Sequence, residues 1–328
     1  MVPAPTRPPI TIAGFKDVYQ VPRVEQALAE LQELGANANE ALKATYLKMI
    51  KAGGQRFTIK PSALPDIDAL IADLPNFAEP LQDIRRQLAL SLASDDALEL
   101  EPMLLLGDPG IGKTHFARRL AKLLGTGYNF VSMSSLTAGW ILSGASSQWK
   151  NAKPGKVFDA LVYGDYANPV IVVDEIDKAG GDQQYDPLGS LYTLLEEDTA
   201  AEFVDEFVEV PIDASDVVWI ATANDARAIP EPILNRMNVY TIEPPDAEGA
   251  RRIAAGIYRE LRAEHGWGRL FPEELAEEPL AKLAKLKPRE MRRVMLAAFG
   301  NAKLAGRHEV LAEDITEERI ARRPRIGF

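Results

Sequence analysis

An eight-residue segment of this chain has the residue types and spacing needed to bind phosphate groups. Its glycines would let successive backbone N–H groups curl around a β-phosphate, at the positive end of the helix that follows. Lys113 would reach the β- and γ-phosphates, and the Thr114 hydroxyl would help to hold Mg²⁺. The alternative is a chance glycine-rich turn before a helix. We expect a nucleoside triphosphate to contact this segment and the residue after it: Gly107, Asp108, Pro109, Gly110, Ile111, Gly112, Lys113, Thr114 and His115.

Two adjacent carboxylates, Asp174 and Glu175, follow the apolar run at residues 170–173. Such a run is typical of a parallel strand buried on both faces, and phosphates bind beyond the carboxyl ends of such strands. Asp174 would organise Mg²⁺ directly or through its water. Glu175 would polarise the attacking water as general base. The competing interpretation is a strand followed by a solvated acidic turn.

Asn224 is a polar residue at the end of a third apolar stretch, residues 217–223. Its amide could hydrogen-bond the γ-phosphate or the attacking water. An Asn after a strand is usually a turn residue, so its assignment depends on the two other strand ends that point to the same site.

Two arginines further along the chain are candidates for contacting the phosphates. Arg236 lies just before the last expected strand, and Arg289 opens a helix. A guanidinium can stabilise charge on a transferring phosphoryl group, and a neighbouring subunit can supply it. Each arginine could instead form a surface ion pair. Arg292 and Arg293 leave the choice within that helix open.

The expected strands and helices would position these residues at one edge of a sheet. Apolar runs predict strands at residues 103–106, 128–133, 170–174, 217–223 and 239–242. Helical spacing follows the phosphate-binding segment up to Leu124, so strands and helices alternate. This alternation predicts an α/β fold with a parallel sheet wrapped by helices.

Helical patterns without strands flank the expected sheet. After Pro245 they occupy residues 247–263, 273–286 and 288–304, which predicts a small helical domain. Before the sheet we expect an N-terminal helical region, preceded by an extended proline-rich tail over residues 1–10. Its helices are expected at residues 23–34 and 39–51, and another at 80–93 leads into the sheet.

The composition narrows the class of protein. The 328 residues suffice for two or three domains. The net charge of −11 disfavours a dominant nucleic-acid surface, although a local basic groove can still exist. Cysteine is absent, which excludes disulfides and fits a reducing compartment. The chain has neither a signal-peptide core nor an apolar run of membrane-spanning length, so we expect a cytoplasmic protein without a membrane partner.

The order of the motifs along the chain resembles that of an AAA+ ATPase. They are the glycine-rich segment, the Asp174-Glu175 pair, Asn224, Arg236 and the later helical domain with Arg289. Over roughly residues 75–300 the resemblance is closest to the ATPase module of Lon proteases. The segments that look like Lon are Val173-Asp174-Glu175-Ile176-Asp177-Lys178, Asp186-Pro187, Glu209-Val210-Pro211, Ile220-Ala221-Thr222-Ala223-Asn224 and residues 229–237.

The resemblance implies how the molecule is organised. It implies an AAA+ core at residues 75–244, a helical lid at 245–318 and a C-terminal tail at 319–328, preceded by the N-terminal region at 1–74. It also implies ATP with Mg²⁺ as cofactors and a homohexameric ring, in which Arg236 reaches the next subunit's nucleotide and Arg289 is the lid sensor. Asp108 stands where the family usually has Pro.

The chain departs from Lon at its two ends. It stops soon after the lid, so we expect no Ser-Lys peptidase domain and a separate protease or effector chain as a partner. The last three residues, Ile326-Gly327-Phe328, resemble a docking tripeptide of Clp unfoldases. The alternative is that this end folds back on the chain or is disordered.

Lon-like rings grip substrate with an aromatic residue shortly before a Pro-Gly-Lys segment. Trp149 and Lys150 occupy that place, ahead of residues 154–156, and their polar neighbours favour exposure. The alternative is an ordinary core tryptophan. Tyr185 would line a second pore loop or be a surface tyrosine.

These features together predict an ATP-driven ring motor that remodels, unfolds or translocates protein. Two alternatives stay open: a nucleic-acid loader or translocase of the same superfamily, and a regulatory scaffold gated by ATP.

Overall fold

The computed structural model describes residues 10–35, 39–94, 97–134, 140–179 and 186–316. Contacts divide the chain into two units. The first, the α/β unit, comprises residues 1–65, 83–106 and 114–241. The second, the helical unit, comprises residues 66–82, 107–113 and 242–328. The domain boundaries expected from the sequence stay a prediction.

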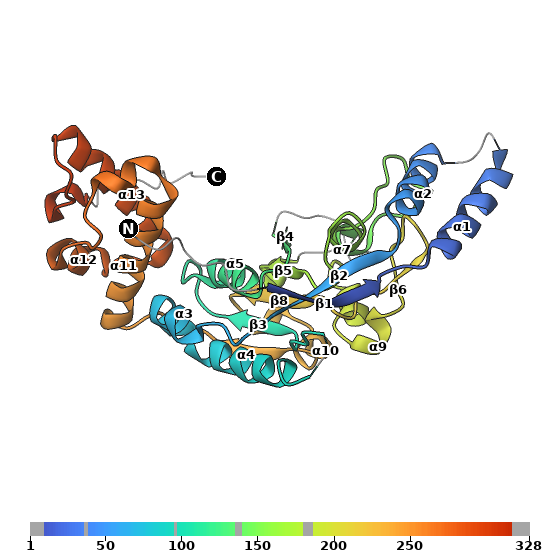
Figure 1. Cartoon of the computed structure of the whole chain (residues 1–328), viewed down its shortest axis with the longest axis horizontal. Helices are drawn as coiled ribbons and strands as arrows, with labels where there is room; N and C mark the ends of the chain where they lie inside the picture. Colours follow the sequence, from blue (N-terminus) through green and yellow to red (C-terminus); the bar gives the residue numbers. More distant parts are fainter. Residues whose placement is uncertain (1–9, 36–38, 95–96, 135–139, 180–185, 317–328) are drawn as a thin grey trace. The chain divides into compact units, whose positions relative to one another are not determined.

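A five-stranded parallel sheet forms the core of the α/β unit, with its strands in the order β4-β5-β8-β3-β9. Figure 1 shows α4 and α5 on opposite sides of β3, which confirms the α/β fold with a helix-flanked parallel sheet. All six residues of β8 are buried, as are the first four of β5. Burial on both faces is the reason these strands are continuous apolar runs. The strands are β3 (Met103–Leu106), β4 (Tyr128–Ser132), β5 (Val170–Asp174), β8 (Val218–Ala223) and β9 (Asn238–Thr241).

The register of the sheet brings the expected site residues to one edge. Val173 pairs with Ala221, and Leu106 pairs with Ala223, so β3, β5 and β8 end at the same edge of the sheet. The helices of the core are α4 (Ala78–Ser91), α5 (Lys113–Leu124), α6 (Trp140–Ser143), α7 (Lys156–Val162), α8 (Leu191–Leu194), α9 (Glu197–Ala200) and α10 (Glu231–Leu234). A short antiparallel pair, β6 (Phe203–Val204) and β7 (Pro211–Ile212), lies between α9 and β8 in the chain.

The N-terminal region contains two helices, as expected, and also a sheet that the sequence analysis missed. Its helices are α1 (Val21–Glu33) and α2 (Glu40–Ala52). Antiparallel strands β1 (Ile10–Asp17) and β2 (Gln55–Pro61) flank them. No local turn signal predicts this pairing, because the two helices separate its strands in the chain. The side chain of Tyr46 in α2 packs in the main core and donates a hydrogen bond of 2.7 Å to the carbonyl of Val208.

The helical unit has its own apolar core. Its helices are α3 (Ile67–Asp73), α11 (Ala247–Glu264), α12 (Glu277–Leu283) and α13 (Pro288–Leu304). The side chain of Asp246 caps α11 by accepting a hydrogen bond from the Gly249 amide, and Pro288 occupies the first turn of α13. Tyr258 and Phe299 stack in the core of this unit. Residues 273–286 were expected to be one helix, but α12 covers only the middle of that range.

In the part of the chain that the structure describes, no helix combines the length and apolar character needed to cross a membrane.

Candidate nucleotide-binding site

The carboxylate of Asp174 is the centre of a hydrogen-bonded cluster at the edge of the sheet. Its Oδ1 accepts hydrogen bonds from the Thr114 hydroxyl at 3.0 Å and from the Thr222 hydroxyl at 2.8 Å. The Thr222 hydroxyl in turn accepts a hydrogen bond of 3.0 Å from the backbone N–H of Glu175. Thus α5, β5 and β8 each contribute one member, and the structure brings together Thr114, Asp174 and the backbone of Glu175.

Glu175 has an unusual backbone conformation at the point where β5 ends. Its φ and ψ are 58° and 49°, in the left-handed region that L side chains rarely adopt. Such positions cost on the order of 1–3 kcal/mol and cluster at functional sites. The conformation turns the chain sharply after Asp174, and a 3₁₀ turn at Ile176–Lys178 follows Glu175 directly. The Glu175 residue is half-buried.

The phosphate-binding segment joins β3 to α5. The Lys113 side chain is 8% exposed, and its Nζ donates hydrogen bonds to the carbonyls of Gly107 at 2.5 Å and Asp108 at 3.1 Å. The Lys113 ammonium group is therefore hydrogen-bonded to backbone carbonyls of the same segment. The carbonyl of Ile111 accepts a longer hydrogen bond, of 3.4 Å, from the Asn76 amide.

The residues around Asp174 fit a magnesium ion whose remaining ligands are water and phosphate. Neighbouring ligands of an octahedral Mg²⁺ lie about 3 Å apart, because each lies about 2.1 Å from the ion. The Asp174 and Thr114 oxygens have this separation. Among the described residues, no group of three or more His, Cys, Asp or Glu side chains could hold a metal ion.

Asn224 and Arg236 lie on the α/β unit. Asn224 is half-buried and follows β8, two residues after Thr222. Arg236 donates a hydrogen bond from Nη1 to the carbonyl of Pro232 at 2.8 Å. Its Nε is 2.6 Å from Oε1 of Glu196, so within this chain Arg236 forms an ion pair.

Of the three arginines considered in α13, Arg289 is adjacent to the phosphate-binding segment. Its backbone N–H donates a hydrogen bond of 3.4 Å to the carbonyl of Gly110, and its side chain is exposed. Arg292 forms ion pairs with Glu260 at 3.1 Å and Glu264 at 2.5 Å, both on α11. Arg292 therefore connects two helices of the helical unit, whereas the backbone of Arg289 contacts the glycine-rich segment.

Trp149 and Lys150 both lie at the surface of the α/β unit. The Trp149 side chain is 41% exposed, so it is not an ordinary core residue. Its ring meets Trp140 edge to face, with the ring centroids 5.0 Å apart. Tyr185 and the Ile326-Gly327-Phe328 terminus lie outside the described residues.

Sequence reasoning missed Thr222, Trp140 and Glu196. Thr222 lies in the Lon-like segment at residues 220–224, but the sequence pattern assigned it no role. A hydroxyl near the end of a buried apolar strand needs a hydrogen-bond partner, and that requirement could have identified it. Trp140 and Glu196 gave no comparable local signal, because their partners lie elsewhere in the chain.

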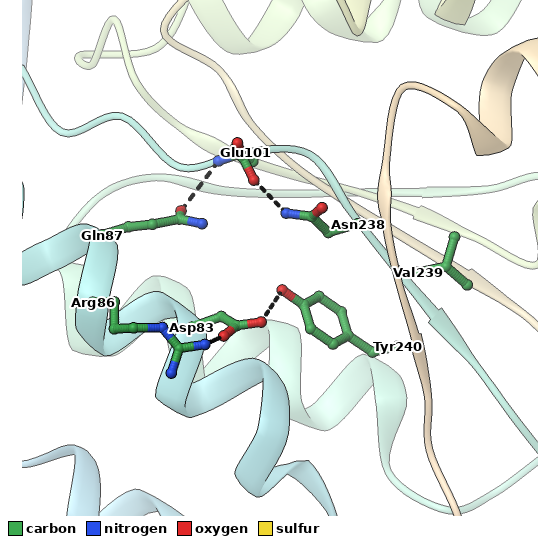
Figure 2. Close-up of a pocket in the computed structure, with 7 residues that line it drawn as sticks. All are labelled: Asp83, Arg86, Gln87, Glu101, Asn238, Val239 and Tyr240. Carbon is green, nitrogen blue, oxygen red and sulfur yellow. Dashed lines mark hydrogen bonds and ion pairs between the residues drawn. The ribbon is translucent and has the colours of Figure 1, made fainter.

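A polar hollow lies away from this cluster, between α4 and β9. Its volume is about 310 Å³. Figure 2 shows the residues that line it. The Tyr240 hydroxyl donates a hydrogen bond of 2.9 Å to Asp83, and Asn238 donates one to Glu101. Arg86 also forms an ion pair with Asp83. Because the charged groups already pair with one another, we assign no ligand to this hollow.

The fold and the cluster define a class of protein. A parallel α/β sheet whose strand ends carry a glycine-rich loop and an Asp-Glu pair is the core of a P-loop nucleoside triphosphatase. Residues 103–244 match the family model described as "ATPase family associated with various cellular activities (AAA)". Over these residues the chain is similar to the AAA ATPases.

Curated relatives include Lon proteases. The mitochondrial Lon protease homologue of Rattus norvegicus is 38% identical over 136 residues, which are 42% of this chain and 14% of the relative. The corresponding protein of Aspergillus niger is 33% identical over 186 residues, 57% of this chain and 17% of the relative. The chain thus spans less than a fifth of the length of these relatives. The resemblance to the ATPase module of Lon proteases is confirmed over this shared region.

A solved structure shares the fold. It is described as "Closed State CryoEM Reconstruction of Hsp104:ATPyS and FITC casein". The TM-score is 0.58 at 15% identity, and the match covers 84% of this chain and 52% of the other. At this identity the match shows the fold alone.

Proposed function

We propose that this chain is an ATP-hydrolysing subunit of a ring-shaped motor that remodels, unfolds or translocates protein. The observation that carries the ATPase proposal is the convergence of the Thr114 and Thr222 hydroxyls on one oxygen of Asp174, next to Glu175. Nucleotide chemistry at this edge needs a metal-ordering carboxylate and a base held in fixed positions, and these hydrogen bonds would hold them.

The residues would act as follows on bound ATP. Lys113 would exchange the carbonyls of Gly107 and Asp108 for oxygens of the β- and γ-phosphates. Asp174 and Thr114 would hold Mg²⁺, which when bound neutralises charge on the phosphates. Glu175 would take a proton from the attacking water, while its backbone stays fixed by Thr222.

Two further residues would complete the hydrolysis site. Asn224 would hydrogen-bond the γ-phosphate or the attacking water. Arg289 would bring a positive charge from the helix that contacts Gly110. Arg236 would act on the nucleotide of the neighbouring subunit, which is the reason we propose a homo-oligomer, most simply a hexamer.

A polypeptide is the substrate class that the surface aromatics favour. Trp149 and Trp140 offer two exposed indoles in contact, and an indole makes large, sequence-tolerant contacts with an extended chain. The curated relatives are named proteases, and casein is named with the structure that shares the fold. Both are consistent with a polypeptide substrate here.

The test is which polymer stimulates ATP hydrolysis. We expect unfolded casein to stimulate the ATPase and single-stranded DNA to leave it unchanged. Trp149→Ala should keep basal hydrolysis and lose casein stimulation and unfolding of a tagged fluorescent substrate. Stimulation by DNA instead would support a nucleic-acid translocase. Tight nucleotide binding without stimulation by either polymer would support an ATP-gated scaffold.

A further inference from the structure

The segment that presents Trp149 is a loop closed at its base. We call residues 144–155 the Trp149 loop. Its two ends meet: the Ala145 amide donates a hydrogen bond of 3.1 Å to the Lys153 carbonyl. A Cβ on Gly155 would lie 2.4 Å from the backbone nitrogen of Gly144, so only glycine permits this approach. The loop therefore leaves and re-enters the core at one point.

The buried carboxylate of Asp205 contacts both ends of the Trp149 loop where they meet. Asp205 lies on the segment between β6 and β7, and its side chain is fully buried. Its Oδ2 accepts a hydrogen bond of 2.7 Å from the Gly155 amide, and its Oδ1 accepts one of 2.9 Å from the Phe207 amide. A Cβ on Gly144 would lie 2.5 Å from Oδ1, so the carboxylate also packs against the other end of the loop.

We call Asp205 and the hydrogen bonds that it accepts from the Gly155 and Phe207 amides the clasp. The electrostatic environment of Asp205 fits a structural role for this clasp. Burial raises the pKa of Asp205 to about 7, against the downward effect of backbone N–H groups on Gly155, Phe207 and Val208. Among the described residues no cation forms an ion pair with it, and the exposed carboxylate of Glu206 raises the pKa further. A buried carboxyl group without a cation is costly, so its three backbone donors are what hold it in place.

A second contact braces the loop nearer to its tip. Asn39 caps α2, where its Oδ1 accepts hydrogen bonds from the amides of Ala41 and Leu42. Its Nδ2 donates a hydrogen bond of 2.7 Å to the carbonyl of Ser147. The N-terminal helical region thus contacts the loop two residues before Trp149.

We propose that Asp205 and Asn39 are positioning residues that hold the Trp149 loop in one presentation, so that Trp149 and Trp140 act together as a contact surface for an extended polypeptide. The proposal rests on the protein-remodelling function proposed above. The exposed side chains of Lys150 and Lys153, in the same loop as Trp149, favour polypeptide segments that carry acidic residues.

Two substitutions test the clasp with little change in volume. In Asp205→Asn only one side-chain atom can accept a hydrogen bond. The hydrogen bond from the Phe207 amide closes a local turn that an Asn side chain also forms. Because the Asn oxygen would accept that bond, we expect the hydrogen bond from the Gly155 amide to be lost. Asn39→Asp keeps the α2 cap but cannot donate to Ser147. Glu206→Gln is the matched control, because it removes a neighbouring exposed carboxylate and leaves the clasp intact.

Hydrogen exchange and fluorine NMR read the loop directly. In the unmodified protein the Gly155 amide should exchange slowly, and in Asp205→Asn at least tenfold faster. With 5-fluorotryptophan, the resonances of Trp149 and Trp140 should shift in both variants. Those of buried Trp219 and of Trp267, in the helical unit, should stay in place and report an intact fold. Fast exchange of Gly155 in the unmodified protein, or an unmoved Trp149 resonance in both variants, would overturn the proposal.

The activity measurements separate this proposal from the proposed function. Asp205→Asn and Asn39→Asp should keep basal ATP hydrolysis within about twofold and lose most of the stimulation by fluorescein-labelled casein, whereas Glu206→Gln should keep both. Full casein stimulation in both variants would contradict the positioning role. If the unmodified protein responds to no polypeptide and Trp149→Ala changes nothing, the proposed function fails, while exchange and fluorine NMR still decide whether the clasp exists.

Discussion

Nε of Arg236 lies 2.6 Å from Oε1 of Glu196 in the same chain. The arginine side chain is 26% exposed and the glutamate 47%, so the pair is partly solvated. Pairs of this kind contribute roughly 0–1 kcal/mol, which makes them easy to break. An arginine that serves a neighbouring subunit would have to leave Glu196 first.

Glu196→Gln should therefore ease assembly of the active oligomer. Loss of up to about 1 kcal/mol of competing attraction corresponds to about a fivefold change in an equilibrium. The protein concentration at half-maximal specific ATPase activity should fall by up to that factor. Titration of activity against protein concentration measures it, with Arg236→Ala as the inactive reference. An unchanged midpoint would show that the ion pair does not compete with assembly.

Glu175→Gln should bind ATP and hydrolyse it about 10²–10⁴ times more slowly, because the amide cannot accept a proton from water. Nucleotide affinity by calorimetry and phosphate release under single-turnover conditions measure the two effects separately. Near-normal hydrolysis would remove Glu175 as the base.

Thr222→Val should impair hydrolysis without creating a cavity in the core. Valine matches the shape of threonine but removes the hydroxyl that donates to Asp174 and accepts from the Glu175 amide. An unpaired buried N–H costs about 1–3 kcal/mol, so the backbone at Glu175 should rearrange. We expect kcat to fall at least tenfold, with Thr222→Ser restoring most of it. Equal kcat values for the Val and Ser variants would contradict a positioning role for the hydroxyl.

Asp205 should make stability depend on pH. Burial raises its folded pKa to about 7 from the ordinary 3.8, so the folded state keeps a proton that the unfolded chain loses. The resulting stabilisation is complete below the unfolded pKa and is lost as pH rises towards 7. The free energy of unfolding of the unmodified protein minus that of Asp205→Asn should fall by at most about 1.4 kcal/mol per pH unit between pH 5 and 7. Denaturation curves of both proteins at pH 5, 6, 7 and 8 measure this difference, and parallel pH profiles would contradict it.

Local patterns in the sequence were enough to predict much of the fold. The apolar runs at Met103–Leu106 and Val170–Asp174 are strands with the expected bounds. Each is buried over nearly its whole length, and burial on both faces leaves a continuous apolar signal. The helix at Pro288–Leu304 also has the expected bounds, because a proline in its first turn and regular apolar spacing mark it. The strands β1 and β2 were missed because their partner is distant in sequence.

The sequence by itself determined the glycine-rich loop at residues 107–112, the carboxylates at the end of β5 and the AAA resemblance, since each depends on residue types at short, fixed spacing. Only the tertiary structure decided that Thr222 and Thr114 meet at Asp174, that Arg236 pairs with Glu196, and that Asp205 fastens the Trp149 loop. The physical reason is that strand register and core packing determine these contacts. The partners lie 40 to 60 residues apart, beyond the reach of local propensity.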